Sequence, residues 1–61
     1  MSLNKKNIKN YSMQGLSLVL KTEKGPVTVW LEPRAVISVP EVQISEQIKN
    51  LHKRRLIQIS N

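Results

Sequence analysis

The chain has 61 residues, a mass of 7.0 kDa, a formal net charge of +6 and no cysteine. This length allows one small domain with a marginal core, and the absence of cysteine excludes disulfides, thiolate zinc sites and a cysteine nucleophile. No apolar stretch is long enough to cross a bilayer and none follows the basic start, so we expect neither a membrane span nor a signal peptide.

The first seven residues are polar and show no periodicity. They predict a flexible basic N-terminal arm over residues 1–7, followed by a single small β-rich domain over residues 8–61. Ile8 and Tyr11 favour a short first strand over residues 8–11, because aromatic and β-branched residues suit a pleated strand.

Residues 15–22 and 27–32 both alternate apolar and polar side chains, the pattern typical of half-buried strands. The side chains expected to face the core are Leu16, Leu18, Leu20, Val27, Val29 and Leu31. Between the two segments, Gly25 can take the positive φ that a hairpin loop of three or four residues needs, and Pro26 is tolerated at a strand start. The sequence therefore predicts an antiparallel hairpin.

Two further strands are expected after the hairpin. Pro33 suits the second position of a turn, and residues 35–39 alternate again before Pro40 ends the strand. Residues 56–60 return to the same period and predict a closing strand.

Between these strands the period changes and predicts an α-helix over about residues 43–53. Its apolar stripe consists of Ile44, Ile48 and Leu51, and Val42 can extend it. Either Ser45 or Gln43 can cap its first turn. A helix this short is unstable alone, so we expect it to pack on the sheet.

The order of elements indicates a mainly β, small α+β protein. We expect an antiparallel sheet or a partly open small barrel of four or five short strands, with one short helix before the last strand. The apolar faces of all these elements should share one core.

The positive charge is concentrated at the two ends of the chain. Residues 1–10 carry +3, residues 11–48 carry −1 and residues 49–61 carry +4. The basic residues of the ends are Lys5, Lys6, Lys9, Lys49, Lys53, Arg54 and Arg55. The C-terminal group is either a contact for phosphates or an acidic partner, or a solvated helix end whose cations complement the helix dipole. We interpret His52, which lies within this C-terminal group, as an ordinary surface residue.

Trp30 is the only tryptophan and falls on the strand face opposite Val27, Val29 and Leu31. With Val19 and Val36 it can form a second apolar patch. This patch is either an assembly contact, for which tryptophan is well suited, or an internal core in which Trp30 packs on Val19. We favour the assembly contact.

One resemblance rests on Asn10 and on the segments LVLKT (18–22), GP (25–26), WLEP (30–33), ISVP (37–40), QIKNL (47–51) and RRLIQI (54–59). This pattern is similar to that of small proteins encoded among the structural genes of tailed bacteriophages. The resemblance implies a compact β module that serves as an accessory or connecting piece of the virion, on the capsid, neck or tail. It implies no catalytic residue.

Two functions are therefore expected. The first is a non-enzymatic module that docks on a larger assembly, a phage virion protein or further copies of itself, without catalytic residue, cofactor or metal. The second is a small nucleic-acid-binding β module of OB or SH3-like shape, supported by the pI of about 10.2 but opposed by an aromatic content of 3%. The candidate binding residues are Lys53, Arg54, Arg55, Lys49, Trp30, Lys5, Lys6 and Lys9. The expected location is the virion for a phage protein and otherwise the cytoplasm.

Overall fold

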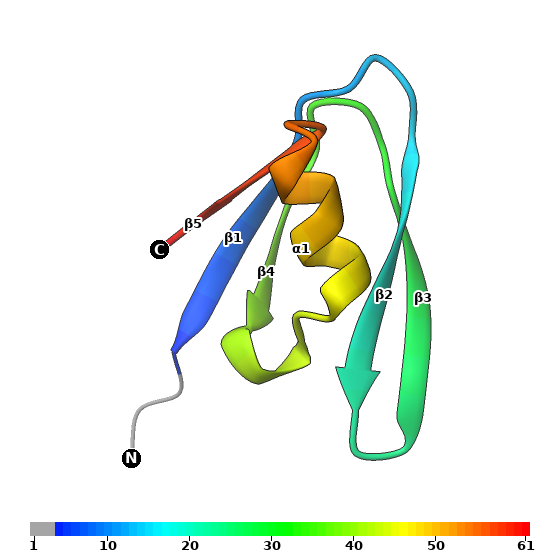
Figure 1. The fold of residues 1–61 in the computed structure, drawn as a ribbon, viewed down its shortest axis with the longest axis vertical. Helices are drawn as coiled ribbons and strands as arrows, with labels where there is room; N and C mark the ends of the chain where they lie inside the picture. Colours follow the sequence, from blue (N-terminus) through cyan, green and yellow to red (C-terminus); the bar gives the residue numbers. More distant parts are fainter. Residues whose placement is uncertain (1–3) are drawn as a thin grey trace.

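The computed structural model describes residues 4–61, which form two antiparallel sheets and one α-helix (Figure 1). The elements are β1 (Lys5–Asn10), β2 (Leu16–Thr22), β3 (Gly25–Leu31), β4 (Val36–Pro40), the 3₁₀-helix η1 (Glu41–Gln43), α1 (Glu46–Lys53) and β5 (Ile57–Ser60). One sheet has the order β4-β1-β5 and the other is the hairpin β2-β3, so residues 4–61 form no closed barrel. The predicted class, with five strands and one short helix before the last strand, is confirmed. No helix in this part of the chain is long and apolar enough to cross a membrane.

The helix α1 lies between the two sheets, with β4 on one side of it and β2 on the other (Figure 1). The buried core contains Ile8, Leu18, Leu20, Leu31, Val39, Ile44, Ile48, Leu51 and Ile57. Every predicted element therefore contributes to one core, as the apolar periodicity predicts. Among the hairpin side chains that were predicted to face the core, Val27 is the exception, because it lies near the turn and is 46% exposed.

The hairpin is confirmed, with a tighter turn than expected. Glu23 and Lys24 form the turn, and Gly25 is already the first residue of β3 with the predicted positive φ, of 113°. The Thr22 hydroxyl stabilises the turn because it donates to the Gly25 carbonyl at 2.7 Å and accepts from the Lys24 N–H at 3.2 Å.

Pro33 lies at the second position of a turn, as predicted. The Ala35 N–H donates to the Glu32 carbonyl at 3.0 Å and closes this turn. The residue after the proline is Arg34, with a φ of 65°, where a turn of this kind usually has glycine.

The helix begins later than expected. Ser45 rather than Gln43 caps it, since the Ser45 hydroxyl accepts from the Ile48 N–H at 3.4 Å. Ile44 lies before the helix and reaches the core through a β-bridge to Leu20. Val42 is exposed in η1, so the proposal that it extends the apolar stripe is wrong.

The start of α1 also completes the outer edge of β2. The Ser45 hydroxyl donates to the Val19 carbonyl at 2.6 Å. The side-chain amide of Gln47 accepts from the Val19 N–H at 3.1 Å and donates to the Ser17 carbonyl at 2.8 Å. The two polar side chains thus bind β2 as a neighbouring strand would, which docks the helix on the hairpin sheet.

The predicted arm is wrong for residues 5–7, which belong to β1; residues 1–3 lie outside the described residues. β1 is the central strand of its sheet and pairs with β4 on one side and β5 on the other. Its backbone therefore finds hydrogen-bond partners on both sides, whereas the polar side chains of Lys5 and Asn7 stay exposed. Backbone hydrogen bonds between strands need no apolar side chain, so hydrophobic periodicity does not detect the start of this strand.

Candidate binding surface

The pairing of β1 with β5 joins the two basic ends of the chain. Lys9 lies opposite Gln58, and Asn10 lies opposite Ile57. Beyond the strand, the Tyr11 N–H donates to the Leu56 carbonyl at 2.9 Å. The two segments that carry most of the positive charge in the sequence are therefore neighbours, and part of their charge lies on one surface.

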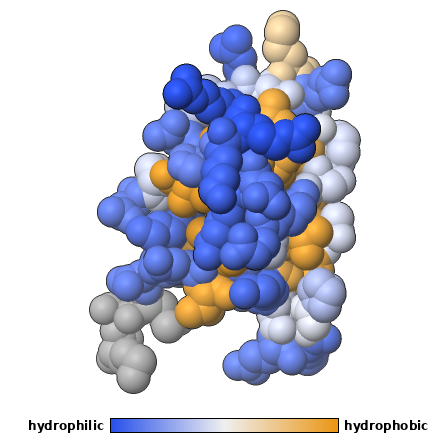
Figure 2. All heavy atoms as spheres, viewed as in Figure 1, coloured by the Kyte–Doolittle hydropathy of each residue, from blue (hydrophilic) through white to orange (hydrophobic). Residues whose placement is uncertain are grey.

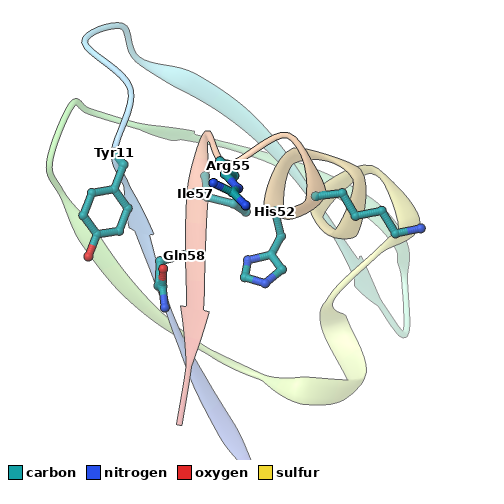
Figure 3. Close-up of a pocket in the computed structure, with 6 residues that line it drawn as sticks. Tyr11, His52, Arg55, Ile57 and Gln58 are labelled. Carbon is teal, nitrogen blue, oxygen red and sulfur yellow. The ribbon is translucent and has the colours of Figure 1, made fainter.

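A shallow hollow of about 620 Å³ lies on this surface around β5. It is lined by Tyr11, His52, Lys53, Arg55, Ile57 and Gln58, and we call it the cationic hollow. Figure 3 shows Tyr11 and Gln58 on one side of β5 and His52 on the helix side, with Arg55 between them. The residues that line the hollow thus lie on both sides of the strand.

The charge of the cationic hollow is of one sign. Lys53 and Arg55 line it, and Lys9 extends it, since its Nζ lies 5.1 Å from the centre of the Tyr11 ring. None of the four glutamates of the chain, all of which the structure describes, is among its lining residues. Figure 2 shows hydrophilic side chains over much of the end of α1, next to the turn into β5. Such a surface attracts carboxylates and phosphates.

Arg55 is held in place by the end of the helix. Its N–H donates to the His52 carbonyl at 3.0 Å, and the Leu56 N–H donates to the Leu51 carbonyl at 3.1 Å. These two bonds are those of a Schellman C-cap, in which the residue after the cap adopts a left-handed conformation. Arg55 has a φ of 63° at this position, where glycine is usual. The chain therefore places a charged side chain where glycine would be less strained.

Asn10 fixes the loops at this end of the molecule. It is fully buried, and its amide nitrogen lies within hydrogen-bond distance of the carbonyls of Gln14 (2.8 Å), Leu31 (3.0 Å) and Glu32 (3.2 Å). Its amide oxygen accepts from the Ser12 N–H at 2.7 Å. One side chain thus joins the loop after β1 to the end of β3, and so positions Tyr11 beside the cationic hollow.

The other basic candidates lie elsewhere. Lys49 forms an exposed ion pair with Glu46 at 3.9 Å and does not line the cationic hollow. Lys5 and Lys6 lie at the far end of β1, opposite Pro40 and Val39, and Lys6 donates to the Asn61 side chain. Arg54 is exposed at the helix C-cap without lining the cationic hollow. Of the predicted binding residues, the structure brings together Lys9, Lys53 and Arg55.

Trp30 is 59% exposed on β3, in the other sheet. Its indole N–H donates to the Glu32 carboxylate at 3.1 Å, and its ring covers Gly15, where any Cβ would collide with it. Val19 lies on the neighbouring strand of the same hairpin, but Val36 pairs with Lys9 in the three-stranded sheet. No single sheet face therefore carries all three residues, and the predicted patch is wrong in this respect.

Sequence analysis did not assign Tyr11, His52 or Gln58 to a binding surface. His52 is exposed on the helix, as expected, but it also faces the cationic hollow (Figure 3). Tyr11 is 57% exposed. The one available signal was that Tyr11 is one of two aromatic residues in the chain and follows a basic segment.

Comparisons of this chain with protein-family models, curated proteins and solved structures give no match. The resemblance to phage structural proteins therefore stays a prediction.

Proposed function

We propose that this chain is a non-enzymatic binding module that docks on an acidic surface of a larger assembly. The resemblance in the sequence suggests a tailed-phage virion as this assembly, with the chain as an accessory or connecting piece. The small core supports the proposal as well, because a marginal domain gains stability when it associates.

The observation that carries the proposal is that Lys53 and Arg55 line the same hollow as Tyr11, over whose ring Lys9 lies. These cations come from β1, the end of α1 and the turn before β5, so the fold itself collects them. Arginine can bind a carboxylate through two parallel hydrogen bonds, and several cations in one shallow surface raise the rate of encounter with an acidic partner.

Charge reversal tests the docking proposal. The double variant Lys53→Glu/Arg55→Glu should lose most of its affinity for poly-glutamate, measured by fluorescence anisotropy of the labelled protein. The matched control is Lys21→Glu/Lys24→Glu, which makes the same change in net charge at two exposed residues of the hairpin. Equal loss in both variants would mean that net charge, not this surface, attracts the partner.

The virion part of the proposal has a separate test. In a phage that encodes this chain, antibodies should detect the protein in purified particles at a fixed ratio to the major capsid protein. Its presence in infected cells but absence from particles would contradict a virion role.

A second candidate function is the binding of nucleic acid. The observation that favours it is the exposed ring of Tyr11 within a cationic surface, because bases stack on aromatic rings while cations hold the phosphates. Affinity for DNA should then fall steeply between about 50 and 200 mM salt. Tyr11→Ala should also weaken binding to single strands, whereas an acidic protein surface needs no ring.

A further inference from the structure

The edge of β5 that faces away from β1 is free within residues 4–61. The bond from the Tyr11 N–H to the Leu56 carbonyl fixes which residues of β5 face β1. Since backbone groups alternate in direction along a strand, Gln58 and Ser60 bond to β1, whereas the N–H and C=O groups of Ile57 and Ile59 point away from it. Ile57 is only 2% exposed, so the groups open to another strand are those of Ile59, which is partly exposed.

This edge runs through the cationic hollow. Ile57 and Gln58 line the hollow, together with the basic side chains of His52, Lys53 and Arg55 on the helix side. A strand added here would place alternate side chains on the two faces of the sheet. One set would face His52, Lys53 and Arg55, and the other would face Tyr11, Gln58 and the neighbouring Lys9.

The free edges of β3 and β4 carry charges of both signs. Glu23 and Lys24 form the turn before β3 and Glu32 follows the strand, whereas β4 lies between Arg34 and Glu41. A second hollow, which touches Pro40 at the end of β4, is lined by Lys21 and Lys24 but also by Glu23. The hollow at β5 differs because all of its charged lining residues are basic. An acidic chain would therefore be favoured here over the other two edges.

We infer that the free edge of β5 binds an extended acidic segment of a partner protein as an added strand. This inference rests on the proposed docking function and specifies its mode. Backbone hydrogen bonds to Ile59 hold the segment, and alternate Asp or Glu side chains contact His52, Lys53 and Arg55. The interaction needs acidic residues at the positions on the helix side. The positions on the Tyr11 side can be polar or, because Lys9 lies there, acidic.

The probe for the test is an acetylated and amidated ten-residue peptide that alternates glutamate with threonine. Bound to the protein, it should slow hydrogen exchange of the Ile59 amide by about tenfold or more, because this N–H group gains a partner. The Gln58 amide already faces β1 and serves as the internal reference. A peptide with lysine in place of glutamate should not bind.

Two changes remove the edge bonds themselves. Ile59→Pro deletes an outward N–H that the fold does not use and should weaken binding about fivefold to tenfold. Ile59→Ala is the matched control: it removes the same side chain but keeps the N–H, and should bind as the unaltered protein does. Because Ile59→Pro could also disturb the fold, two N-methylated peptides are tested on the unaltered protein, one methylated at the threonines and one at the glutamates. N-methylation replaces the hydrogen of a peptide amide, and only every second amide of the bound peptide faces β5. Only one of the two peptides should therefore lose binding.

The outcomes separate the two proposals. If the peptide binds but the Ile59 amide exchanges as before, strand addition is wrong and docking by charge alone stands. If poly-glutamate binds and the peptide does not, strand addition is again wrong. If neither the peptide nor poly-glutamate binds, the docking function is wrong as well. The same holds when DNA binds in their place and the Lys53→Glu/Arg55→Glu variant loses that binding.

Discussion

The side chain of Gln47 takes the place of a neighbouring strand for Val19. Its amide oxygen accepts from the Val19 N–H at 3.1 Å while its nitrogen donates to the Ser17 carbonyl at 2.8 Å. A helix residue thus closes the edge of a sheet, and it does so in the first turn of the only α-helix in residues 4–61.

Gln47→Ala should therefore lower the free energy of unfolding by about 1–2 kcal/mol, because two backbone groups of β2 lose their partners. Urea unfolding measures this change, and the Val19 amide should exchange faster in the variant. Gln43→Ala is the control, since Gln43 caps nothing in this structure. An unchanged exchange rate for Val19 would show that the bond contributes nothing in solution.

Asn10→Ala should lower the free energy of unfolding by about 1–3 kcal/mol, because the buried Leu31 carbonyl and two partly buried carbonyls lose their donor. Asn10→Asp should be worse, since it brings a second acceptor to those carbonyls and buries a charge. Asn7→Ala is the matched control: Asn7 is an exposed residue of the same strand and should change stability by no more than about 0.5 kcal/mol. Thermal unfolding of the three variants tests this order.

Ile48 is fully buried at the centre of the core. Ile48→Ala should cost about 2–5 kcal/mol, a large part of the stability of so small a domain. Circular dichroism should then show a largely unfolded chain or a strongly reduced unfolding midpoint. Val42→Ala, at an exposed position of η1, should be silent, and a silent Ile48→Ala would contradict the core described above.

Arg55 and Arg34 both occupy left-handed positions, with φ of 63° and 65°. Glycine at either site should leave stability unchanged or raise it by up to about 1 kcal/mol, because the strain of an L-residue exceeds the entropic cost of glycine. Both variants lose one positive charge, but only Arg55 lines the cationic hollow. Arg55→Gly should therefore weaken binding to poly-glutamate much more than Arg34→Gly does. Equal weakening would remove Arg55 from the binding surface.

Trp30 stays a predicted assembly contact, separate from the cationic hollow. In the free protein its emission should be red-shifted and readily quenched by acrylamide, because the residue is more than half exposed. The emission should move to the blue when the protein joins its complete assembly, but not when an acidic peptide binds at β5. A blue-shifted Trp30 in a monomer would instead indicate an ordinary packed residue.

The hairpin and the helix were predictable because their signals are local. Alternation at Leu18 and Leu20, the glycine at residue 25 and the stripe of Ile48 and Leu51 each reflect short-range geometry. The start of β1 was not predictable, since Lys5 and Asn7 carry no apolar pattern and the strand forms by pairing with segments about 30 and 50 residues away.

The binding surface also depends partly on local sequence and partly on contacts between distant segments. The sequence by itself determined that the charge is positive, that it lies at both ends of the chain, and that Lys53 and Arg55 follow the apolar stripe of a helix. Only the tertiary structure decided that Lys9 and Tyr11 join them, because β1 pairs with β5 and Asn10 holds the adjoining loops. It also separated Lys49 and Trp30 from this surface. Charge and the spacing of apolar side chains can be read from neighbouring residues in the sequence. The pairing of two distant strands depends instead on how the whole core packs.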